Sequence, residues 1–339
     1  MSVSKYDVAR RAGVSHTTVT RFFRQPELLS PETRERVARA VRELRYVPNA
    51  TAQSLRSGQS RTVALGLPDI TNPFYTTLAR GITDVARQHG YTVMFGNTDE
   101  EPGQEQDFLE MLLSRRVDGL ILAPARGGAD HLLQLQQHAV PVVLIDRLAP
   151  QLWEYSDLVR ADTYDGARQL TNHFIEQGCR DIAFVGPRLS LSSLSERLAG
   201  YNQAMREAGL QERLLLKPFE ISAELDHTDQ LLEGVDLPEA MLLANNVIAL
   251  RMMRALREKG IEIPDRVAIA CIDEVAVAQL LDPPLTTVRQ PNLEMGRLAM
   301  QMLLERMKDP NMGARERILP TELIIRRTSL RSQRSLAAD

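Results

Sequence analysis

Residues 7–21 read DVARRAGVSHTTVTR, and this stretch carries the signals of two short helices joined by a tight turn. Apolar residues at helical spacing precede Gly13, and glycine readily adopts the left-handed conformation that ends a helix. Ser15 can cap a second helix, from His16 to about Phe23, because its hydroxyl can accept a hydrogen bond from an unpaired backbone N–H. The stretch is therefore predicted to form a helix-turn-helix.

A third helix is expected to follow this pair. Ser30-Pro31-Glu32 supplies an N-cap, a proline at the first helical position and an acid in the first turn. The apolar positions of this helix follow the i, i+3, i+4, i+7 spacing of one buried face: Val37, Ala40, Val41 and Leu44. The sequence thus predicts a small three-helix domain at the N-terminus.

The charge of the chain is unevenly distributed. The 339 residues carry a formal charge of only −3, which at first argues against a nucleic-acid partner. Residues 1–60, however, hold 11 basic and 5 acidic residues and carry +6, whereas the remaining 30 basic and 39 acidic residues give −9. A basic head containing a helix-turn-helix is expected to place its second helix in the major groove of DNA.

The residues of this head are more specific than the general pattern. The spacing DVAxxAGVSxxTVxR in residues 7–21, followed by RYVPN in residues 45–49, resembles the headpiece of the LacI/GalR family of bacterial transcription repressors. Thr20 stands where that family usually has Ser. The resemblance implies that His16 and Thr17 read the operator sequence.

Other polar side chains of the head have chemistry that suits DNA. Arg21 lies one turn further along the second helix, where its guanidinium can donate two parallel hydrogen bonds to a guanine edge. Phosphate contacts, which position the protein without reading sequence, are assigned to Ser15, Thr18 and Asn49. The alternative for the second helix is a solvated polar face.

Residues 49–60 are interpreted as a short potential helix followed by a flexible Ser/Gly linker. So short a helix is marginal alone, and it is expected to order only with DNA and a partner subunit. In the family this segment is the hinge helix, which inserts a leucine between base steps in the minor groove. Leu55 holds that position, and Arg56 suits a phosphate or minor-groove contact; the alternative for Leu55 is an ordinary apolar linker residue.

From residue 61 onward, short apolar runs alternate with amphipathic helical stretches. The predicted buried strands are residues 62–67, 92–96, 118–124, 140–145, 181–186, 240–244 and 267–272. This alternation is typical of parallel sheets with crossover helices, and about 270 residues exceed one comfortable doubly wound sheet. The predicted fold class is α/β: a helix-turn-helix headpiece and hinge helix, then two doubly wound parallel α/β subdomains.

Polar and aromatic side chains follow several of these runs, at the strand ends where such sheets bind ligands. Amides, carboxylates and arginines can pair with vicinal hydroxyls, and aromatic rings stack on the C–H faces of sugars. The expected effector-binding residues from this argument are Asn72, Phe74, Tyr75, Asp146, Arg147, Asn245, Asp273 and Gln290. The alternative for Asn72 and Asn245 is helix capping, since each precedes a predicted helix.

The body also resembles the effector domain of LacI/GalR repressors, which shares its fold with periplasmic sugar-binding proteins, so the resemblance covers essentially the whole chain. It implies ligand contacts from the same strand-end residues. It adds Arg197, which begins the RLAGY segment of residues 197–201. Residues 283–288, PPLTTV, match the family's crossover segment between subdomains.

Two departures from the family pattern bear on the ligand. Asn246 replaces the usual Asp, and Ala125-Arg126 replaces a Thr/Ser-Asp pair that accepts sugar hydroxyls. Both changes make the cleft more positive, and Arg126 joins the expected effector-binding residues. We hypothesise an effector with negative charge, for instance a sugar acid or phosphosugar; the alternative is that Arg126 points to solvent.

The chain is divided into a headpiece, a hinge helix with linker, an effector-binding and dimerisation domain, and a polar tail. The predicted boundaries are 1–47, 48–60, 61–330 and 331–339, with an N-subdomain of about 61–160 and 291–319 and a C-subdomain of about 161–290 and 320–330. Because the tail lacks the leucine heptads that tetramerise some family members, a homodimer is expected on a pseudo-palindromic operator. The resemblance places the dimer surface at the helix of about 73–89.

Several other classes of protein are disfavoured. Cys179 and Cys271 give neither a disulfide framework nor a metal spacing, and no cofactor is expected. No membrane-spanning run or signal-peptide core is present, which favours a cytoplasmic protein without a membrane partner. A periplasmic binding protein would have no use for residues 1–60, and an enzyme lacks support because HExxH, GxSxG and standard phosphate loops are missing. The favoured function is a transcriptional repressor that binds double-stranded operator DNA and a small sugar-like effector.

Overall fold

The computed structural model describes residues 3–47, 59–126, 130–187, 191–217, 232, 234 and 236–331. The chain divides into two compact units, residues 1–60 and 61–339. The predicted hinge helix, with Asn49, Leu55 and Arg56, lies outside the described residues.

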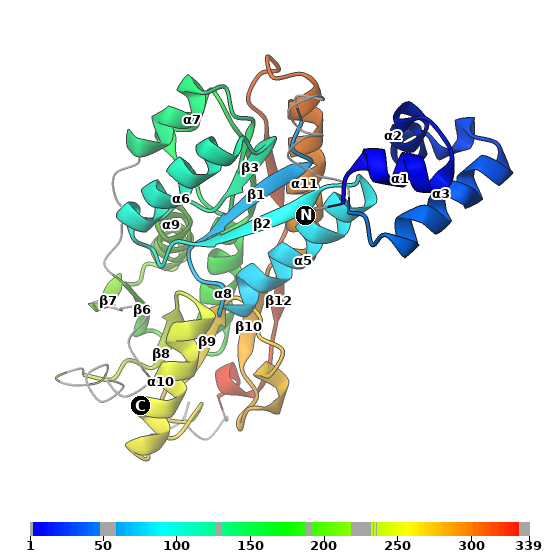
Figure 1. The fold of residues 1–339 in the computed structure, drawn as a ribbon. Helices are drawn as coiled ribbons and strands as arrows, with labels where there is room; N and C mark the ends of the chain where they lie inside the picture. The colour runs from blue at the N-terminus through cyan, green and yellow to red at the C-terminus, as the bar shows by residue number, and fades with distance from the viewer. Residues whose placement is uncertain are drawn as a thin grey trace. The chain divides into compact units, whose positions relative to one another are not determined.

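Helices make up the N-terminal unit (Figure 1): α1 (Lys5–Ala12), α2 (His16–Arg24), the 3-10 turn η1 (Pro26–Leu28) and α3 (Pro31–Glu43). Ser4 and Asp7 form a reciprocal capping box at the start of α1, and Gly13 ends this helix with φ of 64°. The predicted caps Ser15 and Ser30 are confirmed, since each hydroxyl accepts a hydrogen bond from the backbone three residues ahead. Val8, Val19, Val37 and Ala40 are buried in the small core between the helices.

Arg36 on α3 fixes the turn between α1 and α2. Its guanidinium donates to the carbonyl of Ala12 from Nε at 3.1 Å and from Nη2 at 2.7 Å, and Nη2 also donates to the carbonyl of Gly13 at 2.8 Å. These carbonyls lie at the end of α1, where the helix itself supplies no donor. The position of α2 therefore depends on a side chain of the third helix.

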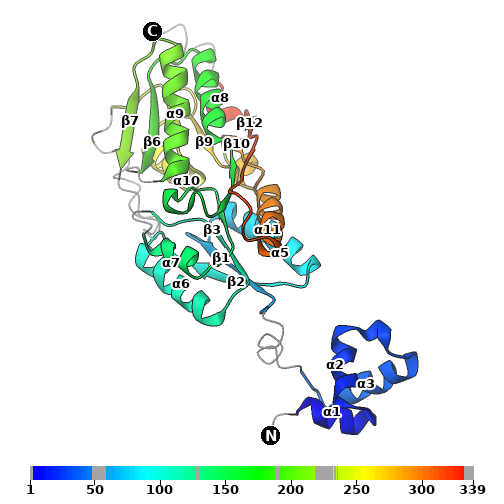
Figure 2. The same cartoon turned by 90° about the horizontal axis from the view of Figure 1, so that it is seen from above.

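Two six-stranded sheets form the body (Figures 1 and 2). The first has the order β11-β5-β4-β3-β1-β2 and is parallel throughout; the second has the order β12-β10-β9-β8-β6-β7, with only β12 antiparallel. The first comprises β1 (Thr62–Leu67), β2 (Thr92–Asn97), β3 (Gly119–Leu122), β4 (Val142–Ile145), β5 (Asp157–Ala161) and β11 (Glu316–Leu319). The second comprises β6 (Ile182–Pro187), β7 (Arg213–Lys217), β8 (Ala240–Leu243), β9 (Ala268–Ile272), β10 (Thr286–Arg289) and β12 (Glu322–Ile324). The predicted α/β class is confirmed.

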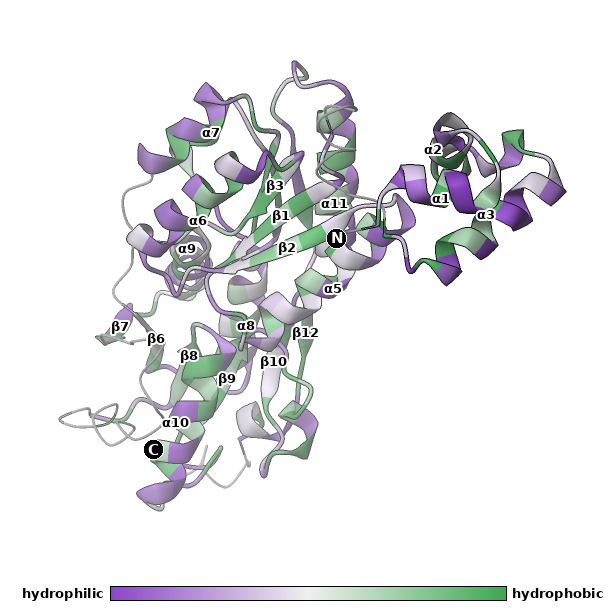
Figure 3. Cartoon of the chain, viewed as in Figure 1, coloured by the Kyte–Doolittle hydropathy of each residue, from purple (hydrophilic) through white to green (hydrophobic). Residues whose placement is uncertain are grey.

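Helices cover both sheets. The first sheet packs against α5 (Pro73–Gln88) and α11 (Asn292–Lys308) through one core cluster, and against α6 (Pro102–Arg115) and α7 (Leu133–Gln137) through another. The second sheet packs against α8 (Thr163–Glu176), α9 (Ser192–Glu207) and α10 (Asn246–Glu258). The body also contains short 3-10 turns, namely η2 (Asp130–Leu132), η3 (Pro150–Leu152), η5 (Ala278–Leu280) and η6 (Arg327–Ser329). Figure 3 shows hydrophobic strands inside and hydrophilic helix faces outside.

The chain passes between the two sheets three times. It leaves the first sheet after β5, returns after β10 to form α11 and β11, and leaves again after β11 to form β12. Residues 283–288 were expected to be a crossover segment, but the second half of them enters β10, and the crossing follows at Gln290 and Pro291. Three chain segments therefore connect the two subdomains.

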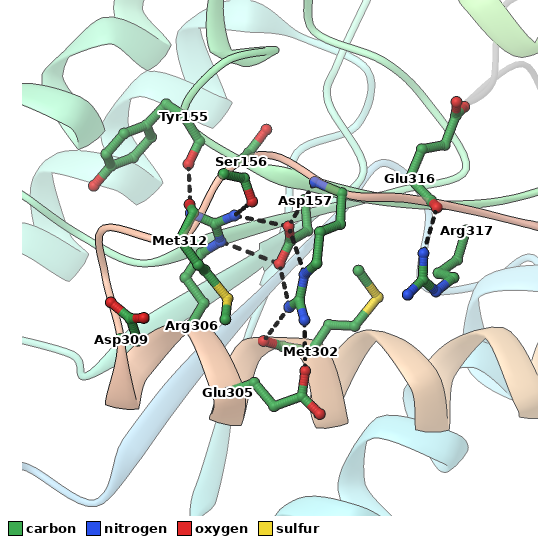
Figure 4. Close-up of polar contacts among 12 residues, drawn as sticks. Tyr155, Ser156, Asp157, Met302, Glu305, Arg306, Asp309, Met312, Glu316 and Arg317 are labelled. Atoms are coloured by element: carbon green, nitrogen blue, oxygen red, sulfur yellow. Dashed lines mark hydrogen bonds and ion pairs between the residues drawn. The ribbon is translucent and has the colours of Figure 1, made fainter.

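A buried ionic cluster holds α11 against the start of β5 (Figure 4). Arg306 of α11 donates to both carboxylate oxygens of Asp157, at 2.7 and 3.1 Å. Arg315 donates to the same carboxylate at 2.8 and 3.3 Å and to Glu305 at 2.6 Å. Burial opposes ionisation of Asp157, but hydrogen bonds from Arg306 and Arg315 outweigh it and hold the pKa below 3.8.

Cys179 and Cys271 are both buried thiols, and burial raises the pKa of each. Within the described ranges, no cluster of three or more His, Cys, Asp or Glu residues could hold a metal ion. No helix in that part of the chain is long and apolar enough to cross a membrane.

Candidate functional site

The exposed face of α2 carries three of the predicted DNA-binding side chains. His16, Thr17 and Arg21 are exposed, whereas Val19 on the opposite face is 1% exposed. The ring centroids of His16 and Tyr6 lie 5.2 Å apart, so the imidazole rests beside an aromatic ring of α1. The buried face of α2 anchors the helix to the small core and leaves its polar face exposed. A major-groove recognition helix needs this arrangement.

The predicted phosphate contacts on α2 lie at its N-terminus. The backbone N–H of Thr18 donates to Ser15 Oγ at 3.1 Å, and the hydroxyls of Ser15 and Thr17 lie 2.6 Å apart. In the structure, Ser15 therefore acts as the N-cap of α2. A capped helix N-terminus also favours an anion nearby because its free N–H groups and dipole are positive.

The body contains a cavity of about 140 Å³ at the carboxyl ends of strands from both sheets. Its lining residues are Asp69, Asn72, Phe74, Tyr75, Glu100, Arg126, Asp146, Arg147, Pro187, Leu191, Ser193, Leu194, Arg197, Asn245, Val247, Ile248, Arg251 and Asp273. Every predicted effector-binding residue except Gln290 is in this set. The strand-end argument therefore predicted lining residues that lie as far apart in sequence as Asn72 and Asp273.

Asp146 and Asp273 occupy equivalent positions in the two halves of the cavity. Each follows a central strand directly, β4 or β9, and each has left-handed backbone, with φ of 67° and 81°. Their backbone N–H groups still donate to the neighbouring strands, to Val159 at 2.9 Å and to Val288 at 3.0 Å. Such backbone is costly for a non-glycine residue and persists where surrounding structure enforces it. Burial raises the pKa of Asp146.

Arg147 is held by the protein itself. Its Nη2 and Nη1 donate to the two carboxylate oxygens of Glu100, at 2.6 and 2.7 Å, and Nη1 also donates to the carbonyl of Pro124 at 3.0 Å. Its Nε lies 3.4 Å from Asp146 Oδ2 and makes no hydrogen bond among the described residues. The paired donors expected from Arg147 for a ligand are therefore already occupied by Glu100.

Arg197 and Gln290 converge on Asp273 in the second half of the cavity. Arg197 Nη1 donates to the carbonyl of Ala244 at 2.6 Å, and Nη2 lies 3.7 Å from Asp273 Oδ1. The side-chain amide of Gln290 donates to the same carboxylate oxygen. Gln290 is 4% exposed and is not among the described lining residues; its contact with the effector stays a prediction, and in the structure its amide contacts Asp273.

Asn72 and Asn245 both cap helices, as the alternative interpretation held. Asn72 Oδ1 accepts a hydrogen bond from the N–H of Phe74 at 3.0 Å at the start of α5, and Asn245 Oδ1 accepts from Ile248 at 2.9 Å at the start of α10. Both residues also line the cavity. Capping fixes where these helices begin and so fixes Phe74 and Tyr75 at the cavity wall.

The formal charges of the described lining cancel. Four carboxylates, Asp69, Glu100, Asp146 and Asp273, face four arginines, Arg126, Arg147, Arg197 and Arg251. Arg126 is 48% exposed and pairs with Glu101 at 3.0 Å, so its charge is also offset outside the cavity. The expectation of a positive cleft is not supported, and the argument for an anionic effector loses its basis.

Sequence reasoning missed several lining residues, above all Glu100. Glu100 comes shortly after the end of β2, so the signal that could have found it is the same strand-end position that predicted Asp146 and Asp273. Arg251, Leu191 and Leu194 lie on or beside helices, where no strand-end signal exists. Their presence follows from how α9 and α10 pack, which the local sequence does not specify.

A helix-turn-helix unit with an exposed second helix, joined in one chain to a two-sheet body with a polar cavity, defines a ligand-responsive DNA-binding regulator. Residues 6–49 match the model of bacterial regulatory proteins of the lacI family, and residues 171–329 match the periplasmic binding protein-like domain. The chain belongs to the lacI family and is a transcription regulator.

The similarity extends over nearly the whole chain. The HTH-type transcriptional repressor CytR of Escherichia coli (strain K12) is 32% identical over 323 residues, 94% of each protein. The ribose operon repressor of Halalkalibacterium halodurans is 33% identical over 323 residues, 95% of this chain and 96% of that protein. A structure of the Lac repressor dimer bound to operator and the anti-inducer ONPF has a TM-score of 0.82 at 28% identity and covers 97% of this chain and 100% of that one. These relatives are repressors, which at the family level argues against an enzyme.

Proposed function

We propose that this regulator is a cytoplasmic, non-enzymatic repressor that binds a pseudo-palindromic operator as a homodimer and responds to a small polyhydroxylated effector. The observation that carries the proposal is the cavity lined by Asp146 from one subdomain and Asp273 from the other. A ligand that contacts both carboxylates binds one arrangement of the subdomains better than another, and this difference is what an allosteric effector requires.

In this proposal the headpiece is residues 1–47, the hinge and linker 48–60 and the effector domain 61–330. His16, Thr17 and Arg21 read bases, while Ser15, Thr18 and Asn49 bind phosphates. Leu55 is the minor-groove wedge and Arg56 contacts the backbone beside it. The dimer surface includes α5.

The DNA-binding part is tested by selecting preferred sequences from random duplexes with the full chain. Arg21→Ala is expected to relax base preference at one position of each half-site, at a cost of about 1–3 kcal/mol in specific binding. Arg34→Ala, which removes an exposed arginine from α3, is the control and should leave the preferred sequence unchanged. A selection that yields no half-site pattern would overturn the proposal.

The effector is sought by thermal shift of the full chain across neutral sugars, sugar acids and phosphosugars. A compound that raises the melting temperature is then added to the operator-binding assay. Asp273→Asn should abolish both effects of that compound while leaving operator affinity without it unchanged. Binding that persists in Asp273→Asn would place the effector elsewhere.

A further inference from the structure

We propose that Glu100 makes the cavity selective for uncharged ligands, because it neutralises Arg147 and occupies the forked donors with which that arginine would grip an anion. The inference rests on the cavity being the effector site and goes beyond that function by assigning a specificity-determining residue and a ligand charge.

Arg147 and Glu100 form a buried, doubly hydrogen-bonded ion pair. The side chains of Arg147 and Glu100 are 8% and 5% exposed, and the two parallel hydrogen bonds of 2.6 and 2.7 Å form the fork-to-carboxylate geometry. The guanidinium carbon lies 6.0 Å from the centroid of the Tyr75 ring, and the carbonyl of Pro124 takes another N–H at 3.0 Å. Three groups, the Glu100 carboxylate, the Pro124 carbonyl and the Tyr75 ring of α5, thus fix one arginine in place.

A carboxylate or phosphate on a ligand would compete with Glu100 for the same fork. Because Glu100 is buried beside the arginine, displacing it would leave a carboxylate without its partner in a poorly solvated site. The protein carboxylate is always present, whereas the ligand must also give up its hydration. An anionic group therefore gains little from Arg147, because the carboxylate of Glu100 already balances its charge.

The other arginine deep in the cavity is restrained in a similar way. Arg197 uses Nη1 on the carbonyl of Ala244 and has Asp273 beside Nη2 at 3.7 Å. Its Nε likewise has no hydrogen-bond partner among the described residues. In both arginines, groups of the protein therefore accept hydrogen bonds from the guanidinium and place a carboxylate beside it, so the positive charge is offset before any ligand binds.

The test removes the negative charge of Glu100 and uses inorganic phosphate as the probe. Glu100→Gln keeps the size of the side chain but frees a net positive charge at Arg147. Titration calorimetry of the full chain should then detect saturable phosphate binding at least about tenfold tighter than in wild type, because a hydrogen bond to a charged group contributes roughly 1.5–3 kcal/mol. Glu110→Gln, an exposed substitution on α6, is the control for general ionic effects and should behave as wild type.

Location is established by Glu100→Gln combined with Arg147→Met, in which the gained phosphate binding should disappear. Wild type that binds phosphate as tightly as Glu100→Gln overturns the proposal, as does a folded Glu100→Gln that gains no binding. If Glu100→Gln does not fold, Glu100→Asp is the second variant. It retains the negative charge and should not bind phosphate, and saturable phosphate binding by Glu100→Asp would also overturn the proposal. The readout needs neither operator nor effector, so failure of the proposed regulatory function would appear separately, in the DNA-binding and ligand-screening experiments.

Discussion

Asn72 and Asn246 exchange hydrogen bonds through their side-chain amides: Nδ2 of Asn246 donates to Oδ1 of Asn72 at 3.0 Å, and Nδ2 of Asn72 donates back at 3.4 Å. Asn72 precedes α5 beside the first sheet, and Asn246 begins α10 beside the second, so this neutral pair joins the two subdomains at the cavity. An Asp at position 246 could accept from Asn72 but could not donate in return.

Asn246→Ala should therefore weaken the contact between the two subdomains. It removes both hydrogen bonds and leaves the Asn72 amide without its partner, at a cost of about 1–3 kcal/mol. We expect small-angle scattering of the full chain without ligand to show a larger radius of gyration. The radius of gyration of Asn246→Asp should lie between those of Asn246→Ala and wild type. A scattering profile of Asn246→Ala identical to that of wild type would show that the other contacts between subdomains suffice.

Asp157→Asn should destabilise the body by about 3–5 kcal/mol, because Arg306 and Arg315 would lose the buried carboxylate that pairs both. The measurement is urea unfolding followed by circular dichroism. Glu305→Gln is the matched control: it removes a 56% exposed carboxylate from the same cluster and should cost less than about 1 kcal/mol.

The same cluster predicts a pH dependence. Because the pKa of Asp157 lies below 3.8 in the folded protein, its stabilising effect is present above that value and is lost as the pH falls through the folded pKa. The difference in free energy of unfolding between wild type and Asp157→Asn should narrow below about pH 4. A constant difference down to complete acid unfolding would contradict the assignment.

His173 should make the second subdomain sensitive to mild acid. The ring is 4% exposed and lies 2.8 Å from Ser329 Oγ through Nε2, and burial lowers its pKa below 6.5. The unfolded chain then binds the proton more readily, so stability falls as the pH drops below 6.5. His173→Gln should lose this dependence, whereas Phe174→Leu, an uncharged change beside it, should cost the same at pH 8 and pH 6.

The sequence predicted the strands that contain no charged residue, including β1 and β2 with their threonines, and missed the strands that carry charged residues. β4 reads VVLI and was found, whereas β5, β7, β10, β11 and β12 each carry charged side chains and were missed. β11 and β12 pair through residues far away in the chain, so their strand character depends on tertiary contacts rather than on local preference.

The candidate site shows the same division. Asp146 and Asp273 could be predicted because both follow apolar central strands, and strand ends in such sheets meet at one edge. The occupation of Arg147 by Glu100 could not, because a side chain has several rotamers and the partner comes from 47 positions away. Residue type and position along the chain were thus enough to predict where the site lies. The balance of charges in the site depends on which side chains pair, and only the folded structure shows that.

Gly296→Ala should separate α5 from α11 and displace the aromatic wall of the cavity. A Cβ at Gly296 would lie 2.2 Å from the carbonyl oxygen of Leu78 on α5, a distance that backbone atoms cannot relieve without moving the helix. We expect a loss of at least about 1–3 kcal/mol in thermal or urea unfolding. Gly103→Ala makes the same chemical change in α6, where a Cβ meets nothing within 4 Å, and should be neutral or stabilising by no more than about 1 kcal/mol. Equal effects at the two positions would mean that helix propensity, rather than the close crossing of α5 and α11, explains the glycine at 296.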